Sequence, residues 1–136
     1  MTYLLDVNAL VAFGFLEHEF HGQVAGWVGE SASERGFELA TCSITELGFT
    51  RVLSQSPEYG LTISEARSLL QRLKTGNAAR FRFIADNHGV SQLPPWVKSP
   101  KQITDGHLAQ LAASNGAILG TLDRSIPGAF LIPKGK

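Results

Sequence analysis

Short apolar runs alternate with amphipathic stretches along the chain. The short runs have the length of buried strands and lie at residues 3–5, 37–41, 81–84 and 117–122, with a short edge strand at 130–132 before Pro133. Apolar residues recur at helical spacing between them, at residues 10–16, 20–28, 43–56, 62–75 and 104–115. Strands that alternate with helices predict βαβ units and a mainly parallel sheet with helices on both faces, which is an α/β fold.

Both ends of the helix predicted at 104–115 carry sequence signals. Thr104 is suited to cap the first turn, because its hydroxyl oxygen accepts from the unpaired amides there. Asn115-Gly116 is typical of a left-handed stop after the last turn. We therefore expect Asp105 to lie at the start of this helix.

Length, hydrophobicity and cysteine content predict a single domain outside the membrane. The 136 residues, 43% of them hydrophobic, suffice for one folded core, which we assign to residues 1–136. No apolar run approaches the roughly 20 residues that cross a bilayer, and the first residues lack the basic region of a secretory signal. The single Cys42 excludes an internal disulfide and a multi-cysteine zinc site, so we expect a cytoplasmic location.

The net charge is zero, but the charges are distributed unevenly. Residues 1–50 hold seven acids and one base, a balance of −6, whereas the remaining residues hold five acids and eleven bases, a balance of +6. A neutral chain does not by itself favour nucleic-acid binding, because contacts to phosphates are mainly electrostatic. The uneven distribution would nevertheless allow one face to bind a polyanion or another charged chain.

Four acidic residues fall at predicted strand ends or helix starts. They are Asp6 after the first strand, Glu46 in the first turn of the helix after the second, Asp105 at the start of a later helix and Asp123 after the fourth strand. Parallel sheets bind ligands at the carboxyl ends of their strands. Carboxylates gathered there repel one another unless a cation is present, and Mg²⁺ and Mn²⁺ prefer oxygen ligands. The acids therefore indicate a candidate metal site.

Each acid also has a purely structural interpretation. Asp6 would cap the first helix, and Ser43 with Glu46 matches a capping box, in which the Glu side chain reaches back to the cap amide. Asp105 is a favourable charge at a helix start, and Asp123 suits a turn. The metal site gains weight because all four residues fall on one predicted edge.

Four short motifs follow one another along the chain. The first is LLDVN at residues 4–8, and the second is SITELGFTRVL at residues 43–53. The third is TDGHLA at residues 104–109, and the fourth is TLD at residues 121–123. In the order and spacing of these motifs, the sequence resembles the PIN-domain nucleases, and most of all the VapC ribonuclease toxins of bacterial toxin-antitoxin pairs. The resemblance spans nearly the whole chain.

The resemblance implies a fold, an activity and a set of site residues. The fold would be a three-layer α/β/α sandwich, and the activity would be metal-dependent endoribonuclease cleavage of RNA phosphodiester bonds by metal-activated water. Asp6, Glu46, Asp105 and Asp123 would hold Mg²⁺ or Mn²⁺, with Asn8 and Thr121 as polar neighbours. We assign Asp6 and Asp105 as direct ligands, whereas Glu46 and Asp123 would act directly or through water.

The resemblance also implies partners. These are an RNA substrate, a cognate antitoxin whose C-terminal segment binds over the active site, and a second copy of the chain in a homodimer. Arg51 and Arg124 lie close in sequence to candidate ligands and are candidates for substrate phosphate contacts. A nucleic acid could also lie along a basic stretch with no intervening acid, which holds Arg67, Arg72, Lys74, Arg80 and Arg82. For the segment from Arg67 to Lys74 we favour a solvated helix face, and we interpret Phe13, Phe15, Phe20 and Trp27 as core or interface residues.

Other functions fit the sequence less well. A non-catalytic module with the same fold would bind RNA or protein without divalent cations, as the uneven charge distribution allows. A phosphatase of the haloacid dehalogenase type would need D-x-D-x-T where this chain has Asp6-Val7-Asn8-Ala9-Leu10. A dinucleotide-binding domain would need G-x-G-x-x-G after Leu5, and that motif is absent.

Overall fold

A parallel sheet forms the centre of the molecule in the computed structural model, which describes residues 1–135. Its strands, in the spatial order β3-β2-β1-β4-β5, are β1 (Thr2–Leu5), β2 (Glu38–Cys42), β3 (Phe81–Ile84), β4 (Ala117–Thr121) and β5 (Phe130–Leu131). All four pairs of neighbouring strands are parallel. Along the chain, β2 and β3 are therefore added on one side of β1, and β4 and β5 are then added on its other side.

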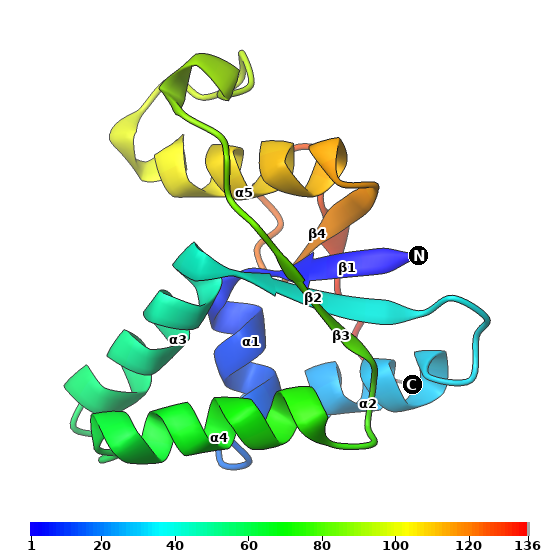
Figure 1. The fold of residues 1–136 in the computed structure, drawn as a ribbon, viewed down its shortest axis with the longest axis vertical. Helices are drawn as coiled ribbons and strands as arrows, with labels where there is room; N and C mark the ends of the chain where they lie inside the picture. The colour runs from blue at the N-terminus through cyan, green and yellow to red at the C-terminus, as the bar shows by residue number, and fades with distance from the viewer. Residues whose placement is uncertain (136) are drawn as a thin grey trace.

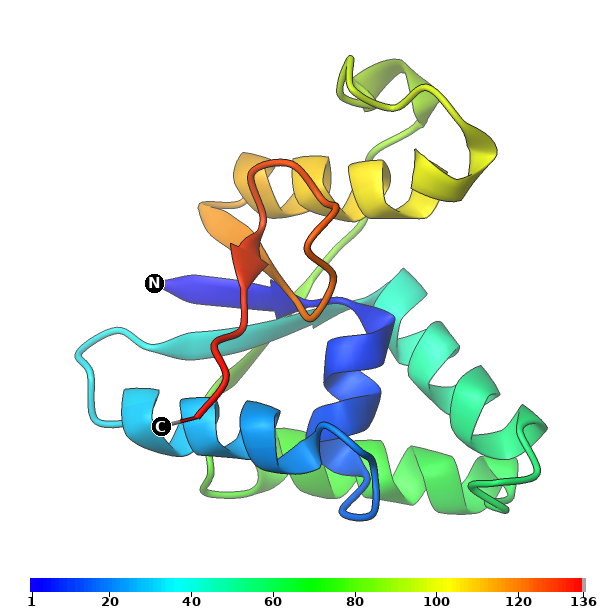
Figure 2. The ribbon, with the colours of Figure 1, turned by 180° about the vertical axis from the view of Figure 1, so that it is seen from behind.

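Helices cover both faces of this sheet (Figures 1 and 2). One face carries α1 (Val7–Gly14), α2 (His21–Ser31), α3 (Ser43–Gln55) and α4 (Ile63–Thr75), and the other carries α5 (Ile103–Ser114). Two short 3₁₀ helices, η1 (Val90–Gln92) and η2 (Pro100–Gln102), precede α5. The predicted three-layer α/β/α arrangement around a parallel sheet is confirmed.

Two hydrophobic clusters join the layers, and the alternation of side chains along the strands divides residues between them. Leu5 and Leu39 belong to the larger cluster, with α1 to α4, where Phe49 is fully buried. Leu4 and Ala40 belong to the smaller cluster, with Leu108, Leu111 and other residues of α5. Successive residues of one strand thus hold opposite layers in place. Within residues 1–135, no helix combines the length and the apolar character needed to cross a bilayer.

The start of α5 differs from the prediction, whereas its end agrees. The helix begins at Ile103 with Gln102 at the cap position, so the predicted cap at Thr104 is wrong. The reason is that the 3₁₀ helix η2 runs directly into α5, and the Gln102 side chain accepts the amides of Lys98 and Ser99. Asp105 still lies in the first turn, as expected. Gly116 has φ = +68°, which confirms the left-handed stop.

Helices α1 and α3 approach closely because α3 has a glycine at the contact. A Cβ atom added at Gly48 would lie only 2.5 Å from Cγ2 of Val7. Val7 directly follows Asp6, and Gly48 lies two residues after Glu46. The contact therefore sets the distance between the helix starts that carry two of the candidate site residues.

We expect Gly48→Ala to destabilise the protein by about 1–3 kcal/mol, the usual cost of overpacking. Urea denaturation would measure the change, and Val7→Ala in the same chain should recover part of it, since it removes the clashing methyl groups. Gly26→Ala is the matched control. Gly26 is exposed on α2 with no atom near its added Cβ, so alanine there should stabilise by about 0.5–1 kcal/mol. Equal stability of Gly48→Ala and wild type would contradict the packing argument.

Candidate active site

Asp6 lies at the switch point of the sheet, which is the place between β1 and β4 where the order in which strands are added reverses. Its amide donates to the Gly120 carbonyl at 3.1 Å, which extends the β1–β4 ladder by one residue. The side chain is only 7% exposed and caps α1, since Oδ1 accepts the Ala9 amide at 2.9 Å. Oδ2 accepts the Thr121 hydroxyl at 2.5 Å. Both carboxylate oxygens are therefore held in fixed positions at the ligand-binding edge of the sheet.

The electrostatics of Asp6 show which acids surround it. Burial raises the pKa of Asp6, and the hydrogen bonds from Thr121 and Ala9 oppose that rise. The negative charges of Asp105 and Asp123 raise the pKa of Asp6 further. Three of the four predicted acids therefore act on one another through space, although Asp6 and Asp123 are 117 positions apart in the sequence.

Asp105 and Asp123 approach Asp6 from different elements. Asp105 is half-buried in the first turn of α5, and burial followed by the charge of Asp123 raises its pKa. Asp123 is exposed after β4, and its amide donates to the Thr121 hydroxyl at 3.0 Å. Its Oδ1 accepts the Ser125 amide and hydroxyl, and these hydrogen bonds lower the pKa of Asp123. Asp123 thus has the predicted turn geometry and also contributes charge to the acidic site.

Glu46 has different neighbours. The predicted Ser43–Glu46 capping box is wrong, because Cys42 is the cap residue of α3 and its amide donates to Thr45 Oγ1 at 2.9 Å. Glu46 Oε2 instead accepts the Thr41 hydroxyl at 2.6 Å and forms an ion pair with Lys74 Nζ at 2.6 Å. Glu46 therefore lies at the carboxyl end of β2, and a cation from α4 balances its charge.

Lys74 is the residue that sequence reasoning missed, because the segment from Arg67 to Lys74 was interpreted as a solvated helix face. The sequence did hold a signal. Lys74 follows the buried residues Ala66 and Leu70 at successive intervals of four, so it continues the inward stripe of α4. A lysine on that stripe needs an acidic partner, and Glu46 provides one.

A depression of about 430 Å³ adjoins the aspartates. Asn8 and Thr121, the predicted polar neighbours, line it together with Asp6 and Asp123. The loop between α1 and α2 closes the other side with His18, Glu19 and Phe20. Phe20 is 41% exposed there, so it is not a core residue and its role at an interface stays a prediction, whereas Phe13 and Trp27 are buried in the core.

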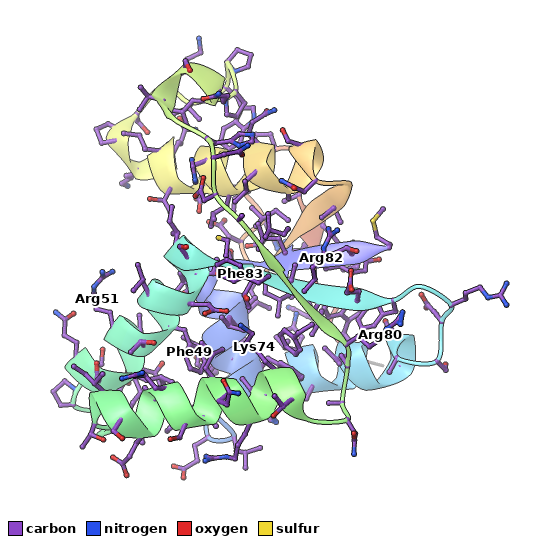
Figure 3. All side chains as sticks on the ribbon, in the orientation of Figure 1. Phe49, Arg51, Lys74, Arg80, Arg82 and Phe83 are labelled. Atoms are coloured by element: carbon purple, nitrogen blue, oxygen red, sulfur yellow. The ribbon has the colours of Figure 1, made fainter. Side chains whose placement is uncertain are left out.

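The two predicted arginines lie on the surface. Arg124 is exposed and directly follows Asp123, so it adjoins the acidic edge. Arg51 is exposed on α3, and Figure 3 shows it on the outer side of that helix, away from Lys74 and Phe83. The placement of Arg124 is the more favourable of the two for a contact with a substrate phosphate.

The donor set suits a hard divalent cation. Within residues 1–135, no three His, Cys, Asp or Glu side chains are grouped closely enough to form a closed metal cage. Mg²⁺ needs no such cage, because it is commonly held through one or two carboxylates, with waters and substrate phosphates as the other ligands. Asp6 and Asp105 offer oxygen donors whose mutual repulsion a cation would relieve. The residues therefore fit Mg²⁺ or Mn²⁺.

The parallel sheet, the helices on both faces and the acids at the switch point define a PIN-like α/β domain. Among solved structures, a chain in the crystal structure of VapBC2 from Rickettsia felis, bound to a DNA fragment from their promoter, has a similar fold. The TM-score is 0.63 at 18% identity, over 96% of this chain and 97% of that one. Comparison with protein-family models gives no match.

Curated relatives identify the family. Ribonuclease VapC38 of Mycobacterium tuberculosis is 36% identical over 127 residues, which cover 90% of this chain and 86% of the relative. Ribonuclease VapC44 of the same species is 34% identical, over 95% of this chain and 94% of the relative. Ribonuclease VapC29 is 35% identical, over 93% and 89%. The chain therefore belongs to the VapC ribonuclease family.

The raised pKa of Asp6 predicts how stability depends on pH. A carboxyl group whose pKa is higher in the folded than in the unfolded state stabilises the fold below its unfolded pKa of about 4, and this contribution is lost as the pH rises through the folded pKa. Asp6→Asn cannot ionise. In EDTA we therefore expect it to be more stable than wild type at pH 7, and to lose that advantage as the pH falls towards 4.

Asp86 is the matched control, because its pKa shifts the other way. Burial raises the pKa of Asp86, but the hydrogen bonds from His107 and the His88 amide, and the charges of the two imidazoles, outweigh burial and lower it. Asp86→Asn should therefore destabilise the protein at neutral pH. Urea denaturation of both variants at pH 7 and pH 4 would test the opposite signs. A loss of stability in Asp6→Asn at pH 7 would show that its capping and hydrogen bonds outweigh the cost of charge burial.

Proposed function

We propose that this protein is a metal-dependent endoribonuclease that hydrolyses RNA phosphodiester bonds, and that it is the toxin of a toxin-antitoxin pair. The observation that carries the proposal is that Asp6 and Asp123 line one depression at the switch point of the sheet, and that Asp105 lies near enough for its charge to act on Asp6. Membership of the VapC ribonuclease family supports the same activity. Repulsion among these carboxylates would be costly in a protein that had no use for a cation.

The protein's own residues prepare the site. The Thr121 hydroxyl and the Ala9 amide fix the Asp6 carboxylate, so no reorganisation of that side chain is needed when substrate arrives. Asp6 and Asp105 would bind the cation directly, and Asp123 and Glu46 would bind directly or through water. Asn8 would orient these groups from the wall of the depression.

A bound Mg²⁺ or Mn²⁺ would supply charge stabilisation at the phosphate and would lower the pKa of water. The chain's own contribution is a set of fixed carboxylates that hold this positive charge at one edge and leave the adjoining depression open to a phosphodiester. Without added positive charge the same carboxylates would repel the phosphate. The scissile phosphate should therefore bind next to Asp6 more weakly when the cation is absent.

Partners follow from the family and from the acidic site. We propose a cognate antitoxin that places an arginine at the aspartates, because a guanidinium would relieve the same repulsion as the cation. The structural neighbour is a VapBC2 structure, which supports a partner of this kind. We also propose a homodimer and a cytoplasmic location.

A non-catalytic binding module is the second candidate. It is favoured by the local structural roles that Asp6 has as a helix cap and Asp123 as a turn residue. Such a module would bind its partners equally well with and without divalent cations. The two candidates therefore differ in their response to metal.

Thermal unfolding against Mg²⁺ and Mn²⁺ tests the metal site. A ligand that binds only the folded state stabilises it by about 2.7 kcal/mol at 100 times its Kd. We expect either ion to raise the melting temperature of wild type by several degrees, and of Asp6→Asn and Asp105→Asn by much less. Glu30→Gln, an exposed acid on α2, is the control and should respond like wild type. Identical shifts in all four proteins would place the cation elsewhere.

Cleavage of RNA tests the reaction. We expect cleavage by wild type in Mg²⁺ or Mn²⁺ and none in excess EDTA, with Asp105→Asn reduced by about 100-fold or more, as for the loss of a key electrostatic group. Circular dichroism would confirm that the variant is folded. Full activity in folded Asp105→Asn would overturn the proposal, and cleavage in EDTA would overturn its metal dependence.

A further inference from the structure

A second depression lies on the β3 side of the sheet, and we refer to it as the α3–α4 groove. It has a volume of about 540 Å³ and lies between α3, α4 and the end of β3. Its lining includes Glu46 and Leu47 from α3, Arg67 and Lys74 from α4, and Phe83 from β3. Figure 3 shows Lys74 and Phe83 close together above α4. Because Glu46 lines it, the groove begins at one of the candidate site residues.

Phe83 is unusually exposed for an aromatic residue within a strand. Phe81, two positions earlier on the same face of β3, stacks with Phe13 of the core. Phe83, in contrast, is 49% exposed. Its backbone partner on β2 is Thr41, whose hydroxyl donates to Glu46. The ring therefore lies at the same edge of the sheet as the candidate acids, two strands from β1 and Asp6.

Lys74 contacts both Glu46 and the Phe83 ring. Its Nζ lies 2.6 Å from Glu46 Oε2 and 5.5 Å from the centroid of the Phe83 ring. Arg67 adds a second cation two helical turns earlier on α4, about 10 Å away along the axis. The groove thus has two cations and one acid, and its acid is already paired.

We propose that the α3–α4 groove binds single-stranded RNA next to the active site, with Lys74 and Arg67 at phosphates and a base stacked on Phe83. An exposed ring beside cations is the combination that single-strand binding uses, because every base has a face that stacks and every nucleotide carries a charge. The lining also includes the exposed apolar residues Leu47 and Ile63, but its two cations against one acid favour a polyanion that carries apolar bases over a purely apolar partner. The inference rests on the proposed function, since it assigns the path of that substrate.

Binding of a fluorescein-labelled single-stranded RNA, followed by anisotropy in EDTA, tests the groove without any cleavage. Phe83→Ala should weaken binding roughly 5- to 100-fold, the worth of one stacked base, with an unchanged salt dependence. Phe83→Leu should weaken binding similarly because it keeps the apolar volume but lacks the aromatic face, whereas Phe83→Tyr should bind like wild type.

Lys74→Ala should weaken binding and reduce the slope of log K against log salt by about 0.7, the value for one phosphate contact on a single strand. Arg80→Ala is the matched control, since it removes the same charge near the opposite end of β3 and lines a separate depression. Figure 3 shows Arg80 well away from Lys74 and Phe83. Glu46→Gln should bind RNA more tightly than wild type in EDTA, because it releases Lys74 from its ion pair.

Wild-type RNA affinity in both folded Phe83→Ala and folded Lys74→Ala would overturn the inference. If the sedimentation of these variants changed as well, the groove would instead be a contact between copies through the exposed Leu47 and Ile63. Because binding is measured in EDTA, its outcome is independent of cleavage. If the protein cleaves RNA but its RNA affinity does not depend on Phe83 and Lys74, only this inference is contradicted. If it binds RNA through these residues but does not cleave it, only the nuclease activity is contradicted.

Discussion

The burial of the Asp6 carboxylate between β1 and β4 is the constraint on which the site depends. The Thr121 hydroxyl and the Ala9 amide hold this charge where two other aspartates of the same sign act on it. Desolvation and repulsion both disfavour the ionised form, and two hydrogen bonds offset only part of that cost. The fold therefore concentrates negative charge at the switch point of its sheet, and a cation bound there, as we propose, would relieve this repulsion.

The structural and functional interpretations of the acids are compatible. Asp6 caps α1 through Oδ1 while Oδ2 accepts a hydroxyl from a distant strand, and Asp123 closes its turn through Oδ1 alone. A carboxylate has two oxygens and about four acceptor positions, so a local role leaves capacity for a ligand. Glu46, in contrast, does not cap its own helix. Thr45 takes over the capping of α3, which leaves Glu46 to pair with α4.

The sequence predicted the layers well because each strand has a strong local signal. Alternation along β1 assigns Leu4 and Leu5 to opposite faces, and they belong to different clusters. The start of α5 was misplaced because a 3₁₀ helix leads into it, and capping preferences do not register such a junction. The ion pair between Glu46 and Lys74 joins residues 28 positions apart, so only the stripe of buried residues on α4 hinted at it.

Glu46 and the aspartates differ in how their charge is balanced, and this difference has a consequence for the proposed reaction. Lys74 already neutralises Glu46, whereas the charges that act on Asp6 and Asp105 are those of other aspartates. A cation would therefore bind first at the aspartates, and Glu46 would join its ligands only when Lys74 finds another anion. An RNA phosphate in the α3–α4 groove would be that anion. RNA and cation would then strengthen each other's binding, because any coupling between two binding equilibria is reciprocal.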